Sequence, residues 1–200
     1  MIKNIIFDIG NVLSDFCWEE FLKDKGFDNE MINRIGRASV MCDTWYEFDK
    51  GVYSDEEVIE LFIKNDPRIA DILHRAFDNV EGMVRLKPTT FPWIKELKEN
   101  GYKIYYLSNF SRKAEIQCPE SVSFIPLTDG GILSYKVKLT KPDPLIYRLL
   151  LNTYGLKPEE CVFIDDTQKN INAAIREGIN GIRFVNFDQA HSELEKLLNA

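Results

Sequence analysis

The chain has 200 residues, which is enough for one domain of ordinary size, or one domain with an inserted lobe, and for a substantial hydrophobic core. Because 44% of the residues are hydrophobic and only 11 Gly and 8 Pro are spread along the chain, the composition excludes a disordered or low-complexity protein. The net charge of −7, without a long basic run, disfavours nucleic acid and anionic membranes as partners.

The N-terminal segment predicts a strand that is buried on both faces. Residues 3–8 contain a short apolar run rich in β-branched and aromatic side chains, and Asp8 ends it. The run is too short for a signal peptide or a membrane span. We therefore expect a cytoplasmic protein whose first strand lies inside a sheet.

Residues 16–87 have a helical pattern instead. Ser54 to Glu57 form a capping-box sequence at the start of one predicted helix. Apolar residues between positions 69 and 76 recur at helical spacing and predict another helix. This all-helical stretch interrupts the pattern of strands on either side of it.

After residue 87, predicted strands and helices alternate. The predicted helices cover 90–100, 144–154 and 170–177, and the predicted strands cover 103–107, 161–164 and 181–185. Residues 130–133 form a further strand or a hairpin. Alternation of this kind predicts an α/β fold with right-handed crossovers, a parallel sheet and helices on both faces of the sheet.

The cysteines and histidines offer no recognisable metal site or catalytic pair. The four cysteines are far apart and form no C-x-x-C motif, which argues against zinc and against a disulfide framework. His74 and His191, the two histidines, each fall within an amphipathic helical pattern. A Ser-His-Asp or Cys-His mechanism therefore lacks candidate residues.

Polar residues follow the predicted strands at the points where ligands bind in open parallel sheets. Asp8 ends the first strand, Ser108 and Asn109 follow the second, and Asp165 and Asp166 follow a third. If these strands are neighbours, three carboxylates converge, and their mutual repulsion requires a cation. Oxygen ligands without His or Cys favour Mg²⁺.

Lys141 lies before the helix predicted to begin at Pro144 and brings a fixed positive charge to the same edge. Each of these residues alone has an ordinary structural explanation, such as a turn or a helix cap. Together, a lysine, a hydroxyl, a free carboxylate and Mg²⁺ describe a site for a phosphoryl group, with the carboxylate as nucleophile.

Four segments resemble the motifs of the haloacid dehalogenase-like superfamily of phosphatases. In chain order they are Phe7 to Val12, Leu107 to Asn109, Lys141-Pro142, and Val162 to Asp166 followed by Asn170. The resemblance covers essentially the whole chain. It implies a Rossmann-like core of residues 1–14 and 88–200 and an inserted helical cap of residues 15–87.

The resemblance also implies a specific role for several residues of these segments. Asp8 would attack phosphorus and form an aspartyl-phosphate. Ser108 and Lys141 would hold phosphate oxygens, and Asn109 would support the loop. Asp165 would act from behind the site by orienting metal-bound water or Lys141.

The implied Mg²⁺ site consists of the Asp8 carboxylate, the backbone carbonyl of Gly10 and the Asp166 carboxylate. The superfamily pattern D-x-D-x-[TV] has a second Asp where this chain has Gly10. That Asp protonates the leaving group and then activates water. Its loss removes an acid-base contribution of about 10² to 10⁴ in rate, or roughly 3 to 5 kcal/mol of barrier.

The loss of this acid matters least for a good leaving group, such as the anomeric oxygen of a sugar 1-phosphate. The opening F-D-x-G-N-V is similar to a branch of the superfamily that includes glucose-1-phosphate phosphatases. We therefore expect a small phosphate ester, a sugar phosphate in particular, as substrate. Asp15 is the nearest substitute acid along the chain, and the alternative is an ordinary hinge residue.

Arg37, Trp45 and Tyr46 are the cap residues that we consider for substrate contact, although an aromatic pair at i and i+3, such as Trp45 and Phe48, more often packs in a core. The sequence gives no indication of oligomeric state. A phosphate-binding or regulatory protein weakened by Gly10 remains an alternative to the phosphatase. Dehalogenase activity without metal is disfavoured, since it leaves the Asp165-Asp166 pair unexplained.

Overall fold

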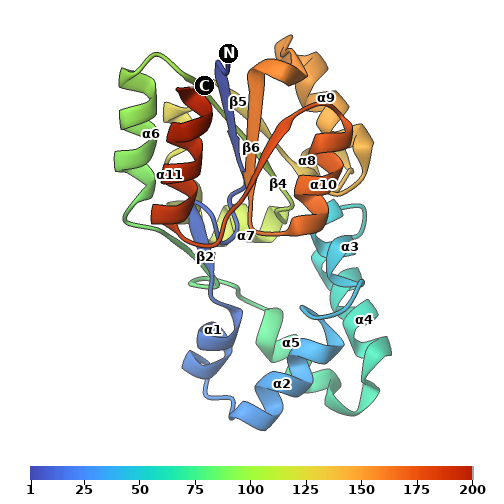
Figure 1. The fold of residues 1–200 in the computed structure, drawn as a ribbon. Coiled ribbons are helices and arrows are strands. Elements are labelled where there is room, and N and C mark those ends of the chain that lie inside the picture. Colours follow the sequence, from blue (N-terminus) through green and yellow to red (C-terminus); the bar gives the residue numbers. More distant parts are fainter. Residues whose placement is uncertain (200) are drawn as a thin grey trace.

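The computed structural model describes residues 1–199 and contains a central sheet of five parallel strands (Figure 1). The strands, in their spatial order, are β5 (Gly130–Leu133), β4 (Lys103–Ser108), β1 (Asn4–Phe7), β6 (Cys161–Asp165) and β7 (Asn180–Arg183). β1 therefore lies at the centre, between β4 and β6. The predicted α/β fold with a parallel sheet is confirmed.

Helices cover both faces of this sheet. The helices of the core are α6 (Thr90–Glu99), α7 (Arg112–Gln117), α8 (Ser134–Val137), α9 (Pro144–Tyr154), α10 (Gln168–Arg176) and α11 (Phe187–Leu198). Successive residues of β1 point to opposite faces: Ile5 and Phe7 pack with α6 and α11, whereas Ile6 packs with α9 and α10. Both sides of each strand are thus buried, which explains the continuous apolar runs in the sequence.

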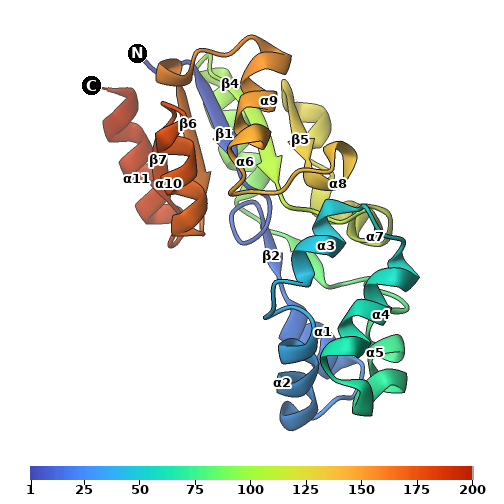
Figure 2. The same ribbon diagram turned by 90° about the vertical axis from the view of Figure 1, so that its right-hand side faces the viewer.

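A helical cap lies beyond the carboxyl ends of the strands (Figures 1 and 2). It consists of α1 (Trp18–Asp24), α2 (Asn29–Ala38), α3 (Trp45–Lys50), α4 (Asp55–Asn65) and α5 (Ala70–Phe77). These helices surround their own hydrophobic cluster, in which the ring of Trp45 contacts those of Phe48, Phe62 and Phe77. The predicted capping box is present, since the side chains of Ser54 and Glu57 bond each other's backbone N–H groups.

Two short strands join the cap to the core. β2 (Ser14–Phe16) pairs with the antiparallel β3 (Val84–Leu86), so the chain leaves and re-enters the core through one two-stranded ribbon. Sequence reasoning missed this ribbon, because three residues give too little alternation to distinguish a strand from a loop. The proposed boundaries of the cap, at residues 15 and 87, fall in or next to the ribbon.

Other differences from the predicted elements are small. Residues 130–133 form the edge strand β5, α10 begins two residues earlier than predicted, at Gln168, and β7 ends at Arg183. The short helices α7 and α8 were not predicted. No helix within residues 1–199 has the length and apolar character that crossing a membrane requires.

Candidate active site

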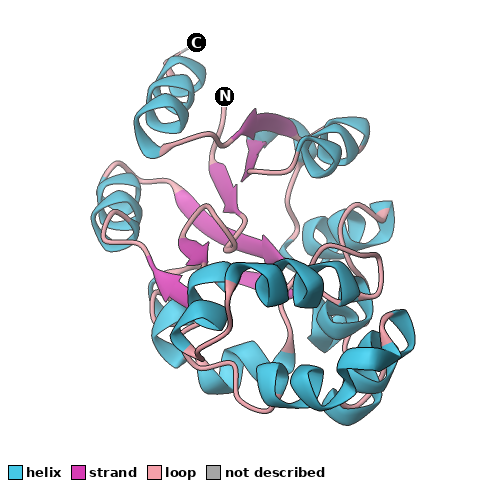
Figure 3. Cartoon of the chain, turned by 90° about the horizontal axis from the view of Figure 1, so that it is seen from below, coloured by secondary structure: helices cyan, strands magenta, loops and turns pink. Residues whose placement is uncertain are grey.

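The carboxyl ends of β1 and β6 bring two of the predicted carboxylates together. Phe7 is in register with Ile164, so the residues that follow, Asp8 and Asp165, lie next to each other at the edge of the sheet that faces the cap. In Figure 3, which views the molecule from below Figure 1, helices of the cap lie in front of part of this sheet. The site is therefore formed where core and cap meet.

Lys141 lies between these two carboxylates. Its Nζ is 2.8 Å from Oδ1 of Asp8 and 2.7 Å from Oδ2 of Asp165, and its side chain is only 1% exposed. The side chain of Asn109 holds the backbone of Lys141 from both sides: its Nδ2 donates to the Lys141 carbonyl (3.0 Å), and its Oδ1 accepts from the Lys141 N–H (2.7 Å). Asn109 thus fixes the loop that carries the lysine.

Asp165 and Asp166 differ in how much of each carboxylate is occupied by protein donors. Asp165 is fully buried and accepts from Lys141, from the backbone N–H of Thr167 (2.7 Å) and from Nδ2 of Asn170 (3.1 Å to each oxygen). Asp166 is partly exposed and accepts from Nδ2 of Asn11 (2.9 Å) and from Oγ1 of Thr167 (3.1 Å). Asp165 therefore holds Lys141, whereas Asp166 is the carboxylate that faces the site.

The donor atoms fit a hard divalent cation. Carboxylate oxygens of Asp8, Asp165 and Asp166 lie within 4.8 Å of one another, and no His or Cys belongs to this group within the described chain. Asp165 is saturated by its protein donors, which leaves Asp8 and Asp166 as the carboxylates for a metal. Gly10, the third predicted metal ligand, lines the same cavity.

Burial sets the charge balance at this edge. It raises the pKa of Asp8 to about 7, although the nearby Lys141 opposes the shift. Burial alone would lower the pKa of Lys141, but the carboxylates of Asp165 and Asp8 outweigh it and raise the pKa above its ordinary value. Lys141 is therefore permanently cationic, and a bound cation would favour the ionised form of Asp8.

A cavity of about 380 Å³ lies between the core and the cap. Its core side includes Asp8, Gly10, Asn109, Lys141, Asp166 and Lys169, and its cap side includes Asp43, Trp45, Tyr46, Phe48 and Asp49. Ser108 is buried against Asp8, where its hydroxyl lowers the pKa of that carboxyl group, and it does not reach the cavity wall. Its contact with phosphate stays a prediction.

Two sequence-based expectations about the cap are not supported by the geometry. Arg37 lies on α2 beside Arg34 and Arg68 in a different surface hollow, away from the cavity of the site. Asp15 forms an ion pair with Lys87 at the β2–β3 ribbon and is absent from the cavity wall formed by residues 1–199. Asp15 follows Asp8 closely in sequence, but its carboxylate pairs with Lys87, the residue that follows β3.

Sequence reasoning missed Asp49, a buried carboxylate of α3 that lines the cavity. Burial and, to a smaller extent, the negative charge of Asp8 raise the pKa of Asp49 to about 8, although Lys141 opposes the shift. One signal was present in the sequence: Asp49 follows Trp45 by four residues, so it shares the face of the helix that carries this apolar ring. A charged residue on such a face calls for an explanation.

Comparison with known proteins supports the assignment of the fold. Residues 2–178 match the family model described as haloacid dehalogenase-like hydrolase. A solved structure of the HAD family enzyme bt-2542 from Bacteroides thetaiotaomicron, in complex with magnesium and inorganic phosphate, superposes with a TM-score of 0.68 at 22% identity, covering 96% of this chain and 98% of that one.

Two curated relatives carry the names of phosphate-ester hydrolases. Sesquiterpene phosphatase astK from Aspergillus oryzae is 24% identical over 196 residues, covering 98% of this chain and 96% of the relative. Flavin mononucleotide hydrolase 1 from Arabidopsis thaliana is 26% identical over 159 residues, covering 76% of this chain and 61% of the relative. Since the family model spans most of the chain, this protein belongs to the haloacid dehalogenase-like hydrolases.

Proposed function

We propose that this protein is a Mg²⁺-dependent phosphomonoesterase that acts on a small phosphorylated metabolite through an aspartyl-phosphate at Asp8. The observation that carries the proposal is the position of Asp8: its carboxylate is bound by Lys141 on the floor of a cavity, with Asp166 on the same wall. A nucleophile, a fixed cation and a pair of metal-binding carboxylates are the groups that phosphoryl transfer to a carboxylate requires.

Each residue of the site has a defined task in this reaction. Asp8 attacks phosphorus, and its Oδ1 is held in orientation by Lys141 and by the backbone N–H of Ile9 (2.7 Å). Lys141 and Ser108 stabilise the charge on the phosphoryl oxygens, while Asp165 and Asn109 position the lysine. Asp8, Asp166 and the carbonyl of Gly10 would hold Mg²⁺, which would supply Lewis acidity at the phosphoryl group.

The substrate class that we propose is a phosphorylated sugar or a similarly small metabolite. A cavity of about 380 Å³ has the size of a small-molecule site. The names of the two curated relatives are those of phosphate-ester hydrolases, which supports the reaction class. Gly10 favours esters whose leaving oxygen departs readily, and sugar 1-phosphates have this property.

The test is a screen for phosphate release from sugar 1-phosphates, sugar 6-phosphates and p-nitrophenyl phosphate, with Mg²⁺ and with EDTA. We expect Mg²⁺-dependent turnover, and we expect Asp8→Asn to reduce it by roughly a thousandfold or more, which is about 4 kcal/mol of barrier. Turnover that survives in Asp8→Asn at the wild-type rate would contradict the proposal.

Gly10 favours one other candidate, a binding protein that keeps the phosphate pocket without efficient catalysis. Under this alternative, the screen shows no turnover of any ester, whereas inorganic phosphate and Mg²⁺ raise the melting temperature of the protein. The aryl ester distinguishes the two candidates, because its leaving group needs no acid and a true Asp8-dependent enzyme therefore hydrolyses it.

A further inference from the structure

The site described so far lacks a group that protonates the leaving oxygen. At position 10 a Cβ atom would meet no atom within 4 Å, so the space beside Gly10 is open to the cavity. Departure of an alkyl oxygen from phosphorus without a proton is slow, and acid catalysis supplies about 10² to 10⁴ in rate. A second titratable group facing this space is therefore chemically significant.

Asp49 reaches the cavity from the opposite wall, on cap helix α3. Its residue is 8% exposed, and its carboxylate has no hydrogen-bond or ion-pair partner among residues 1–199. Its backbone is fixed, because Oγ of Ser134 in the core donates to the Asp49 carbonyl (2.5 Å). A buried carboxylate without protein donors is costly when ionised, unless its surroundings give it a partner.

The electrostatic surroundings of Asp49 favour its protonated form. The groups that influence it are Asp8, whose charge raises the pKa of Asp49, and Lys141, whose charge lowers it, in addition to burial. With a pKa of about 8, the carboxyl group carries a proton near neutral pH, as an acid catalyst requires. Asp49 and the nucleophile Asp8 line the same cavity.

Other acidic residues of the cavity are less suitable. Asp43 is exposed to solvent on the cap side. Asp166 accepts hydrogen bonds from Asn11 and Thr167 and is needed for the metal in the proposed reaction. Asp165 is saturated by Lys141 and its other donors. Among the described carboxylates of the site, Asp49 alone is buried, unpartnered and open to the cavity.

We propose that Asp49 is the general acid and base of the reaction and takes the place of the Asp that the chain lacks at position 10. The proposal rests on the phosphatase function proposed above. It places a catalytic residue in the cap, so that cap and core together form the complete site. It also extends the substrate range to esters with poor leaving groups, such as sugar 6-phosphates.

The proposed reaction has two steps. In the first, a bond forms between a carboxylate oxygen of Asp8 and phosphorus, the ester P–O bond breaks, and the proton of Asp49 moves to the leaving oxygen. In the second, water attacks phosphorus, one of its protons moves to the Asp49 carboxylate, and the Asp8–phosphorus bond breaks. Phosphate and the alcohol are released, and both aspartates regain their starting forms.

The experiment compares kcat/KM for p-nitrophenyl phosphate and for glycerol phosphate, with Mg²⁺, in wild type, Asp49→Asn and Glu47→Gln. The value of kcat/KM reports the steps up to departure of the leaving group. For Asp49→Asn we expect a fall of about 100-fold or more with the alkyl ester and of less than about threefold with the aryl ester. Glu47→Gln removes a carboxylate of the same helix α3 that does not line the cavity, and as the control it leaves both values at the wild-type level.

A rescue variant tests the same point in the opposite direction. Adding Gly10→Asp to Asp49→Asn is expected to restore the alkyl ester activity at least about tenfold, because the space beside position 10 is open. Equal losses with both esters would assign Asp49 a structural role only and would overturn the inference. An unchanged alkyl value in Asp49→Asn would do the same.

A measurement on the wild type keeps the inference testable if Asp49→Asn does not fold. If the leaving oxygen is protonated, kcat/KM of the wild type should fall by less than about tenfold from phosphate esters with aryl leaving groups to those with alkyl leaving groups. A steeper fall would overturn the inference. A wild-type enzyme that hydrolyses p-nitrophenyl phosphate through Asp8 but shows this steep fall refutes the role of Asp49 alone. A wild type inactive towards every ester refutes the phosphatase proposal and this inference together.

Discussion

The core and the cap of this protein are stabilised in different ways. In the core, charged groups at the strand ends bond one another: Lys141 binds Asp8 and Asp165, and Asn170 binds Asp165. In the cap, aromatic rings pack around Trp45, and the one carboxylate that faces the cavity from a buried position, Asp49, has no partner in the described chain. The charged groups of the core are thus held in place by one another, whereas the cap provides an apolar wall and one carboxylate without a partner in the described chain.

Few polar contacts join the two regions. Ser134 binds the carbonyl of Asp49, Lys138 binds the carbonyl of Gly51, and Lys169 of α10 contacts the hydroxyl of Tyr46. These three end on or next to α3, while other polar contacts join core residues 113–118 to Asp55 and Val80 of the cap. The position of α3 relative to the sheet therefore depends on a small number of bonds, whereas the position of Asp8 depends on the register of a whole sheet.

The largest effect is expected from Lys141→Met, which keeps the side-chain stem and removes the charge between two buried carboxylates. We expect loss of phosphatase activity and a fall in unfolding free energy of about 3–5 kcal/mol at neutral pH, measured by urea unfolding. The loss should shrink as the pH is lowered, because the pKa of buried Asp8 rises further without the lysine, and protonation then relieves the repulsion.

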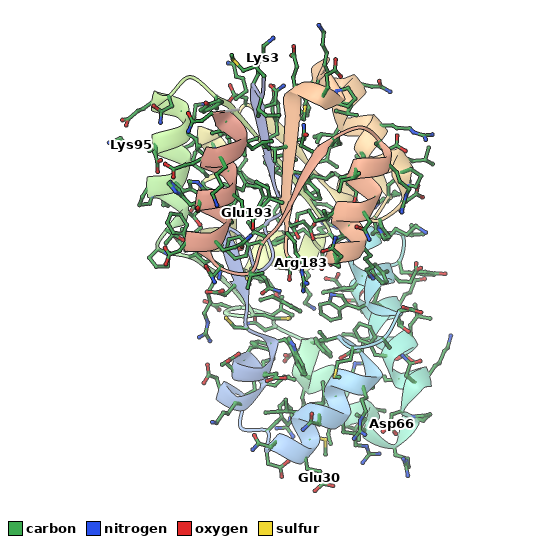
Figure 4. The ribbon with its side chains drawn as sticks, viewed as in Figure 1. Lys3, Glu30, Asp66, Lys95, Arg183 and Glu193 are labelled. Carbon is green, nitrogen blue, oxygen red and sulfur yellow. The ribbon has the colours of Figure 1, made fainter. Side chains whose placement is uncertain are left out.

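Lys3→Met is the matched control, because it removes an exposed lysine that pairs with Glu160 at 2.7 Å. Figure 4 shows Lys3 at the opposite end of the sheet from the cap. Its removal should cost less than about 1 kcal/mol. Similar losses of unfolding free energy in Lys141→Met and Lys3→Met would show that the buried ion pairs of Lys141 do not stabilise the core more than an exposed ion pair does.

The second prediction concerns the aromatic packing of the cap. Phe62 is 1% exposed, and its ring centroid lies 5.8 Å from that of Trp45 and 5.3 Å from that of Phe77. Phe62→Ala should lower the unfolding free energy by about 3–5 kcal/mol, since it leaves a cavity in the cluster. Calorimetry measures the loss, and limited proteolysis should locate the first cleavages within the cap.

Phe91→Ala provides the comparison for Phe62→Ala, because Phe91 lies on core helix α6 with 40% of its surface exposed. Its removal is expected to change stability by less than about 1 kcal/mol. First cleavages in the core of Phe62→Ala would contradict the view that the cap has its own independent packing.

The smallest effect is expected at the outer surface of the cap, where Figure 4 shows Asp66 far from the core. A hydrogen bond from Arg34 lowers the pKa of Asp66 to about 2 from an ordinary value of 3.8. The ionised carboxylate therefore stabilises the fold above about pH 4, and this contribution disappears as the pH falls from about 4 towards 2. Asp66→Asn should accordingly be less stable than wild type at pH 7 and equally stable near pH 2.

Thermal melts of both proteins across this pH range measure the difference. In an Arg34→Met background the pH dependence of the Asp66→Asn effect should be much weaker, because the principal cause of the pKa shift is gone. A stability difference that stays constant from pH 7 to pH 2 would show that the carboxylate acts through its shape and not through its charge.

Much of the active-site edge was predictable from the sequence. Asp8 and Asp165 each follow an apolar strand, and parallel strands bring their carboxyl ends to one edge, so the convergence of these residues follows from the order of elements. Asn109 and Lys141 were predictable for the same reason, since each lies in a loop at that edge. For Asp15 the sequence left open a substitute acid or an ordinary hinge residue, and the ion pair with Lys87 at the β2–β3 ribbon is in keeping with the hinge residue.

The sequence by itself thus determined the parallel sheet, the helical insertion and the residues that gather at the strand ends. Only the tertiary structure decided that α3 faces the site, that Arg37 lies elsewhere and that Asp49 projects into the cavity. The physical reason is that helical periodicity fixes which residues share a face of a helix, whereas the direction of that face depends on packing between segments distant in the chain.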